Sequence, residues 1–203
     1  MSGVFISYRR EDSAPYAGRL YDRLVAQFGT EQVFMDVDDI PPGADFGAYI
    51  GAKVGSCDAL IAVIGKNWLT ARNDAGQLRL SDPNDYVALE IALALQRGVL
   101  VIPVLVGGAA MPRAEELRGD LKGLAERNAV TMNDAEFQRD ANAFVQVLEK
   151  LPGLRRRPAS DEAKVALRKR LMRRLVWKAP LIFALVTFAA WWQWRSNQES
   201  PAR

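Results

Sequence analysis

The stretch that decides the fold is Ser81–Gly107, with the sequence SDPNDYVALEIALALQRGVLVIPVLVG. Its first half is typical of a helix with marked ends: Asp82 is placed to cap the N-terminus and Pro83 suits the first helical position. Gly98 suits the residue that follows the helix. The second half, Val99–Val106, is a short β-branched apolar run, which indicates a strand buried on both faces of a parallel sheet. The stretch therefore predicts one helix–strand unit of an α/β fold.

The predicted helix carries a charge at an unusual position. Glu90 is the only charged residue in its apolar body, and Asp85, just before that body, is expected to act as a capping-box acid. Two interpretations of Glu90 are open. The first places it in a narrow solvent-facing stripe, whose other members are Pro83, Tyr86 and Arg97. In the second it lines a cleft at the edge of the sheet, where partial desolvation suits a catalytic carboxylate.

The rest of residues 1–152 alternates predicted strands with predicted helices. Short apolar runs predict strands at Val4–Tyr8, Val33–Met35, Ala59–Gly65 and, at an edge, Ala129–Met132. Amphipathic spacing predicts helices at Ala14–Phe28 (capped by Ser13), Phe46–Cys57 and Glu136–Leu151, with short helices between Met111 and Arg127. This alternation predicts βαβ units and a parallel sheet covered on both faces. Ligands of such sheets bind outside the carboxyl ends of the strands.

Composition excludes several classes of chemistry. The chain of 203 residues contains no histidine, which rules out Ser-His-Asp and Cys-His nucleophilic sites and any His-ligated zinc centre. Cys57 is the only cysteine, so the chain forms no internal disulfide and a reducing compartment fits best. We therefore expect chemistry based on carboxylates, hydroxyls, arginines and backbone groups.

The net charge of +3 hides an asymmetry along the chain. Residues 1–154 carry 15 basic and 21 acidic side chains, a net charge of −6, whereas residues 155–178 carry 10 basic and 2 acidic side chains, a net charge of +8. An acidic globular part is a poor nucleic-acid binder, and no nucleic-acid partner is expected for it. For the basic collar, contact with anionic lipid is favoured over contact with nucleic acid because of the segment that follows.

That segment predicts a membrane span. Val176–Trp194 contains one charge, Lys178 near its end, and as a helix it would extend about 28 Å, enough for a bilayer core. Tryptophans at both ends resemble interfacial belts, namely Trp177, Trp191, Trp192 and Trp194. The alternative is an apolar helix that packs on a partner protein. The basic excess before the span predicts a single-pass inner-membrane protein with residues 1–152 in the cytoplasm, followed by a linker (153–175), the span (176–194) and a tail (195–203).

Three motifs, in order, resemble a TIR (Toll/interleukin-1 receptor) domain of the bacterial type. They are FISYRRED (5–12), DVDDIPPGADF (36–46) and the helix with Tyr86-x-x-x-Glu90, and the resemblance covers residues 1–152. It implies a flavodoxin-like three-layer fold with a central five-stranded parallel sheet, to which the C-terminal transmembrane helix is added. Asp36 after a strand also suggests a response-regulator receiver, but the early acidic pair and the switch lysine of that fold are missing.

The resemblance implies an NAD+ hydrolase that cleaves the nicotinamide–ribose bond, with NAD+ as substrate and no cofactor. Glu90 matches the family's catalytic glutamate. Residues matching substrate-binding positions, or lying near them, are Arg9, Arg10, Tyr86, Trp68, Asp38 and Asp39. The alternatives are ion pairs with Glu11 or Asp12 for the two arginines, and core packing for Trp68. The sequence departs from the family at Pro41, where an NADase of animal axon degeneration has an acid, and at Tyr86, where a tryptophan is usual.

The resemblance also implies TIR–TIR association, with the loop Ile40, Pro41, Pro42 and Gly43 as the contact. A non-catalytic adaptor in signal transduction, acting by such contacts alone, is therefore the alternative function. The two are compatible because family enzymes often complete their site across two copies. The family suggests a bacterial defence or signalling role, in which anchoring raises the effective concentration of the domains.

Overall fold

The computed structural model describes residues 3–35 and 46–157 of the chain. The chain divides into two compact units, residues 1–157 and residues 158–203, and the second unit lies outside the described residues. The predicted contact loop at 40–43 and the predicted span at 176–194 lie outside them too. Among the helices that the structure does describe, none is long and apolar enough to cross a membrane.

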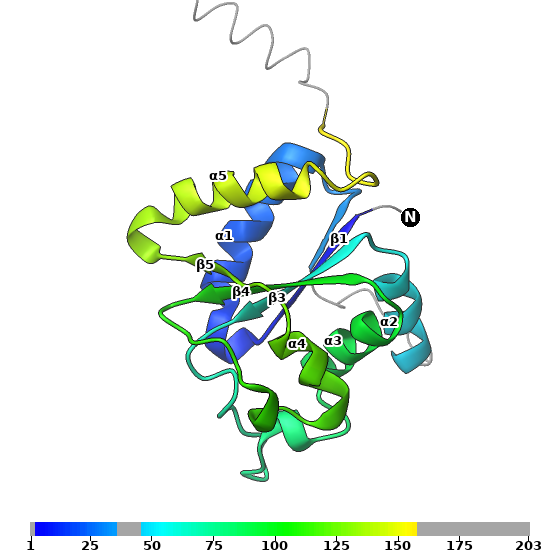
Figure 1. The fold of residues 1–203 in the computed structure, drawn as a ribbon, viewed down its shortest axis with the longest axis vertical. Coiled ribbons are helices and arrows are strands. Elements are labelled where there is room, and N and C mark those ends of the chain that lie inside the picture. The colour runs from blue at the N-terminus through cyan, green and yellow to red at the C-terminus, as the bar shows by residue number, and fades with distance from the viewer. Residues whose placement is uncertain (1–2, 36–45, 158–203) are drawn as a thin grey trace, which may run out of the picture. The chain divides into compact units, whose positions relative to one another are not determined.

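Within the described residues, five strands form one parallel sheet in the order β2-β1-β3-β4-β5 (Figure 1). The strands are β1 (Val4–Tyr8), β2 (Val33–Met35), β3 (Ala59–Ile64), β4 (Leu100–Val106) and β5 (Val130–Met132). Each lies where its apolar run predicts, and β5 is an edge strand that pairs with β4. The predicted five-stranded parallel sheet is confirmed.

Helices cover both faces of the sheet, which gives the predicted three layers (Figure 1). One face carries α1 (Arg10–Phe28) and α5 (Phe137–Leu148), and the other carries α2 (Phe46–Gly55), α3 (Tyr86–Gln96) and α4 (Lys122–Ala125). Short 3-10 turns lie at Arg79–Ser81, Ala114–Glu116, Gly119–Leu121 and Asp134–Glu136. The flavodoxin-like α/β architecture predicted from the sequence is therefore correct for residues 3–157 as far as they are described.

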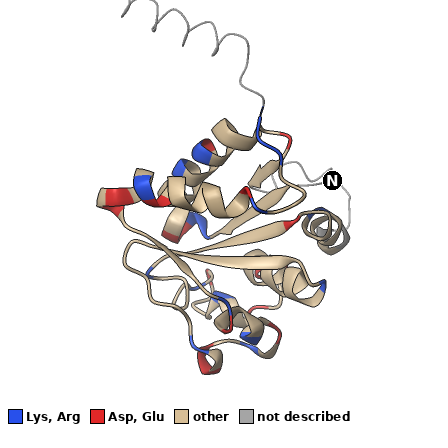
Figure 2. Ribbon diagram, turned by 45° about the horizontal axis from the view of Figure 1, so that its top comes forward, with Lys and Arg blue, Asp and Glu red and all other residues tan. Residues whose placement is uncertain are grey.

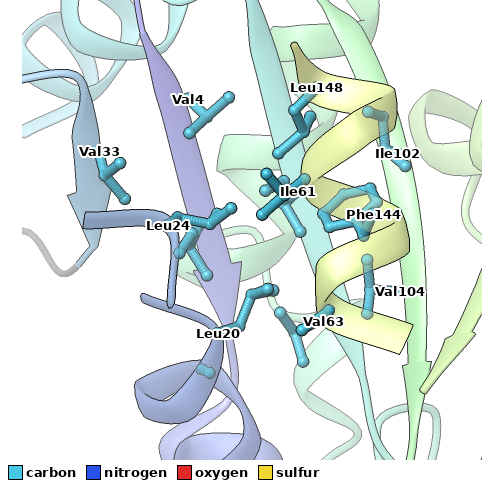
Figure 3. Close-up of a cluster of buried hydrophobic side chains, with 14 of the residues drawn as sticks. Val4, Leu20, Leu24, Val33, Ile61, Val63, Ile102, Val104, Phe144 and Leu148 are labelled. Atoms are coloured by element: carbon cyan, nitrogen blue, oxygen red, sulfur yellow. The ribbon is translucent and has the colours of Figure 1, made fainter. Parts of the chain in front are cut away.

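An apolar core lies on each side of the sheet. Because side chains alternate along a strand, Val4 and Ile6 of β1 enter the core under α1 and α5, whereas Phe5 enters the core under α2 and α3. Figure 3 shows the first core, in which Leu24 of α1 and Phe144 of α5 pack with the strand residues. The five strands carry no charged residue and are tan in Figure 2, as expected for a sheet buried on both faces.

Helix α1 begins earlier than predicted. Its first residue is Arg10 rather than Ala14, and Ser13 is not its cap but lies inside the first turn. The backbone N–H of Ser13 donates to the carbonyl oxygen of Arg9 at 2.8 Å, and its hydroxyl donates to the same oxygen at 3.3 Å. Glu11 and Asp12 stand in the first turn, where acidic side chains interact favourably with the helix dipole. These two acids therefore favour the observed helix start at Arg10 over the start at Ala14 that Ser13 suggests.

The globular unit extends beyond residue 152 through a short strap, which we define as residues 154–157. Leu154 is buried in the core under α1 and α5. The strap's backbone is hydrogen-bonded to the domain: Gln32 pairs with the N–H and the carbonyl of Arg155, both at 2.8 Å, and the N–H of Arg157 donates to Gln27 at 2.8 Å. Gln32 directly precedes β2, so the strap leaves the domain at the amino-terminal edge of the sheet.

Candidate functional site

The carboxyl ends of β1 and β3 bring together residues that are far apart in the sequence. Tyr8, the last residue of β1, pairs in register with Val63 near the end of β3. Arg9 follows β1 at once, and the connection 65–85 leaves the end of β3 and leads into α3. This is the edge at which parallel α/β sheets bind their ligands, and it is the edge that the sequence predicts for the site.

A buried ion pair crosses this edge between Arg9 and Asp85. Nη1 of Arg9 donates to Oδ1 of Asp85 at 3.0 Å, and Nη2 donates to Oδ2 at 2.5 Å. The exposed fractions of the two side chains are 0% and 1%. Such a two-pronged contact fixes the orientation of both groups as well as their distance. Neither of the two partners predicted for Arg9 as an alternative, Glu11 and Asp12, takes this place.

The ring of Trp68 covers the guanidinium of Arg9. The guanidinium carbon lies 5.5 Å from the ring centroid, within the range of a cation–π contact. Trp68 itself is 1% exposed and belongs to the core under α2 and α3. Arg9 reaches this core because its backbone is still extended, with φ −94° and ψ 122°, so its side chain continues the Phe5 side of β1.

A second arginine approaches the same carboxylate from the rim. Nε of Arg79 lies 4.0 Å from Oδ1 of Asp85, and the same guanidinium pairs with Glu11 in the first turn of α1. Burial raises the pKa of the Glu11 carboxyl, but a hydrogen bond from its own backbone and the contact with Arg79 outweigh burial and hold that pKa below its usual value. Asp85 thus lies between two cations, of which Arg9 is the buried one.

The start of α3 differs from the prediction for a reason that this ion pair explains. Asp85, not Asp82, is the residue before the first helical residue, and its side chain makes no hydrogen bond to the helix backbone. Its carboxylate is instead committed to Arg9. The carboxylate of Asp82 accepts the N–H of Asn84 at 2.8 Å, in a turn before the helix. Both predicted capping roles are therefore wrong, whereas the predicted stop at Gly98, with φ +70°, is confirmed.

Glu90 is buried on the inner side of α3. Its exposed fraction is 5%, whereas Tyr86, one turn earlier, is 51% exposed, and Pro83 and Arg97 are exposed as well. The interpretation of Glu90 as part of a solvent-facing stripe is therefore wrong. The other buried residues of α3 are apolar, namely Ala88, Ile91 and Ala94. Because so little of Glu90 is exposed, water screens its carboxylate weakly, so the carboxylate can stabilise a nearby positive charge strongly.

Polar atoms without a partner gather at the same edge. Among the described residues, the buried side-chain atoms that lack a hydrogen bond are Ser7 Oγ, Arg9 Nε, Asp12 Oδ2 and Trp68 Nε1. All of them come from the end of β1, the first turn of α1 or the connection after β3. Burying such atoms costs free energy, and each one in a native protein calls for an explanation beyond packing. Their position marks this edge as the polar site of the domain.

The structure brings some of the predicted site residues together and leaves others apart. Arg9 and Trp68 contact each other, and Arg9 is tied to the residue that precedes the helix of Glu90. Arg10 is exposed as the first residue of α1, and Tyr86 is half exposed at the first residue of α3. The other predicted residues, Asp38, Asp39, Ile40, Pro41, Pro42 and Gly43, lie outside the described residues.

Sequence reasoning missed Asp85 and Ser7 as members of this site. The neighbours of Asp85 give a strong local signal for a helix start and so predict a capping role, whereas its ion-pair partner is 76 positions away. Ser7 stands in an apolar strand, where nothing in the sequence distinguishes a buried hydroxyl from a core residue. In the described ranges, no group of three or more His, Cys, Asp and Glu residues is arranged to hold a metal ion.

Comparisons with known proteins identify the family. The family model described as TIR domain matches residues 4–148. Among solved structures, the TIR domains of the activated Roq1 resistosome, which directly recognises the pathogen effector XopQ, match with a TM-score of 0.54 and 13% identity, over 72% of this chain and 98% of that chain. A flavodoxin-like domain from Synechococcus sp. matches with a TM-score of 0.37 and 15% identity, over 73% of this chain and 99% of that chain. No curated protein matches the sequence.

The family match and the likeness to the Roq1 TIR domains support different conclusions. The likeness to the Roq1 TIR domains supports the fold alone, since the identity is only 13%. The family match runs from the first residue of β1 to the last residue of α5. It thus spans the whole sheet, both helical layers and the edge that carries Arg9, Asp85 and Glu90. The chain belongs to the TIR-domain family.

Proposed function

We propose that this TIR domain hydrolyses NAD+ at the bond between nicotinamide and ribose, with Glu90 as the catalytic carboxylate. The observation that carries the proposal is the burial of Glu90, at 5% exposed, on an otherwise apolar helix face that begins at the polar edge of the sheet. A buried carboxylate beside the ligand-binding edge of a parallel sheet is a candidate for a functional group. The resemblance of Tyr86-x-x-x-Glu90 to the family's catalytic helix points the same way.

The chemistry suits a carboxylate that acts without histidine. The bond to be broken joins C1′ of the ribose to a ring nitrogen that carries a positive charge. When the bond breaks, its electron pair moves to that nitrogen, so nicotinamide leaves as a neutral molecule and the ribose becomes oxocarbenium-like. The Glu90 carboxylate would stabilise that positive centre. Water then bonds to C1′ and releases a proton to solvent, which leaves ADP-ribose.

Two exposed residues at the start of α1 and of α3 suit the binding of NAD+. Tyr86 offers an aromatic face one helical turn before Glu90, on which a base or nicotinamide ring can stack. Arg10, exposed at the start of α1, suits the pyrophosphate. Asp38 and Asp39 remain proposed substrate contacts in the loop before α2.

We further propose that TIR–TIR association, through the loop 40–43, assembles the site, and that residues 176–194 anchor the protein in a bacterial inner membrane with the domain in the cytoplasm. The TIR domains of Roq1 belong to an activated resistosome, which gives a precedent for assembly. The strap, through which the chain continues toward residues 176–194, is hydrogen-bonded to Gln27 and Gln32 at the amino-terminal ends of the strands. Confinement to a membrane raises the effective concentration of the domains.

The test is nicotinamide release by the full-length protein in lipid vesicles. Glu90→Gln keeps the size of the side chain and removes its charge, and Glu126→Gln, at an exposed position, is the matched control. We expect release by the wild type and by Glu126→Gln, and a loss of about a hundredfold or more in Glu90→Gln. Equal rates in all three proteins would refute the role of Glu90. No release by any of them at high surface density would favour the non-catalytic adaptor instead.

A further inference from the structure

We infer that Arg9 and Asp85 are positioning residues that act through Glu90, because their buried ion pair fixes the start of α3 to the end of β1. The inference rests on the proposed function, in which Glu90 is the catalytic carboxylate. It assigns Arg9 a different task from the substrate contact that the sequence suggests.

The burial of the pair leaves Arg9 little to offer a substrate. Its side chain is 0% exposed, and its two terminal nitrogens each donate to a different oxygen of Asp85. The ring of Trp68 lies against the guanidinium. A substrate phosphate would have to displace a charged partner and an aromatic ring to reach these nitrogens, and a buried pair in which both oxygens are taken resists such exchange.

The position of Asp85 connects the pair to Glu90. Asp85 is the residue from which α3 starts, and its carbonyl oxygen accepts the N–H of Leu89 at 2.9 Å. Glu90 is the next residue along the helix. Because a helix moves as a rigid unit over one or two turns, a shift of its first residue moves the carboxylate of Glu90 by a similar distance. The side chain of Asp85 makes no capping bond, so its charge serves the contact with β1 rather than the helix end.

The free-energy cost of burying the Arg9–Asp85 ion pair indicates that the pair serves to fix the position of α3. Burying two charges loses their hydration, and a neutral pair of similar size is often tolerated as well or better in such places. A catalytic group, by contrast, needs its position fixed closely, since a displacement of about 1 Å can lower a rate about a hundredfold. A bidentate ion pair at the residue before α3 can fix the position of Glu90 that closely.

The experiment uses the double variant Arg9→Gln/Asp85→Asn of the full-length protein in vesicles, because removing both charges leaves no unpaired ion. The control is Arg113→Gln/Glu116→Gln, which removes an exposed ion pair that contacts neither Arg9 nor Asp85 in any bond described above. We measure kcat and KM for NAD+, and amide hydrogen exchange of the peptide that covers α3. We expect kcat to fall about ten- to a hundredfold in the double variant with KM changed by less than about threefold, and exchange in α3 to become faster. The control should match the wild type in all three measurements.

Two outcomes would overturn the inference. An increase in KM of more than about tenfold with kcat retained would show that Arg9 binds the substrate. Unchanged kcat together with unchanged exchange would show that the pair does not hold α3. If the wild type releases no nicotinamide, the proposed function fails by itself, and hydrogen exchange then decides alone whether the pair fixes the helix of Glu90.

Discussion

The sharpest stability prediction concerns the charge balance around Asp85. In Asp85→Asn the buried guanidinium of Arg9 loses its partner. Arg79, whose Nε lies 4.0 Å from Oδ1 of Asp85, loses the same negative charge. In Arg9→Gln, by contrast, Asp85 keeps Arg79 as a partner. Breaking a buried ion pair typically costs about 3–5 kcal/mol. We therefore expect Asp85→Asn near the upper end of that range and Arg9→Gln near the lower end.

The double variant should be more stable than either single variant. With both charges removed, neither side chain of the pair is a buried ion, and glutamine and asparagine can share a hydrogen bond, so we expect a loss of about 1 kcal/mol. Urea unfolding followed by far-UV circular dichroism measures all four proteins. With a slope of about 2 kcal/mol per molar urea, the midpoint of Asp85→Asn should fall by about 2.5 M and that of the double variant by about 0.5 M.

The order of the urea midpoints of the two single variants and the double variant tests whether Arg9 and Asp85 act as a pair. If the double variant unfolds at lower urea than Asp85→Asn, the two side chains do not act as a pair and the reasoning is refuted. A midpoint for Asp85→Asn within about 0.3 M of the wild type would show that Arg9 regains water or another partner, which its burial does not allow.

Further predictions follow from other contacts. Burial raises the pKa of the Cys57 thiol from 9.0 to about 11. Ionisation of the unfolded thiol should therefore lower the free energy of unfolding by about 2 kcal/mol between pH 9 and pH 11, and Cys57→Ala should lack this part of the pH dependence. The same burial predicts slow modification of the native thiol by a disulfide reagent at pH 8, and fast modification in urea. A protein ending at residue 157 should be about 3 kcal/mol more stable to urea than one ending at 153, because the strap buries Leu154 and adds backbone hydrogen bonds. A Cβ atom at Gly55 would collide with the side chain of Arg97, which donates a hydrogen bond to the carbonyl of Gly51. Gly55→Ala should therefore raise the free energy of unfolding by about 1 kcal/mol in the Arg97→Ala variant and by less in the wild type. Thermal unfolding of the wild type, both single variants and the double variant measures this difference.

The sheet could be predicted because its signals are local and redundant. Strands β3 and β4 are apolar runs bounded by polar or glycine residues, and strands that are buried on both faces cannot have another composition. Helix α5 was recognisable because Phe137, Phe144 and Leu148 recur at helical spacing, and all three are buried. For these elements, local preference and tertiary packing agree.

The residues at which α1 and α3 begin could not be predicted, because tertiary contacts outweigh the local sequence signals at this site. Asp82 has the residue type and the neighbours of a cap, yet the helix begins at Tyr86 after a residue whose charge is held by Arg9. The burial of Glu90 could not be decided from the sequence for a similar reason. Helical periodicity places Glu90 at the boundary of the apolar face, and only the packing of α3 on the sheet determines whether that position is buried or exposed to solvent. The roles of Arg9 and Trp68 depend on the same long-range contacts.

The central claim is that Glu90 acts in the transition state of NAD+ cleavage rather than in folding or substrate binding. The most direct measurement compares NAD+ binding and single-turnover nicotinamide release in the wild type and Glu90→Gln, both full-length in vesicles. The claim predicts a Kd for NAD+ within about threefold of the wild type and a release rate at least about a hundredfold slower. Release by Glu90→Gln at the wild-type rate would contradict it.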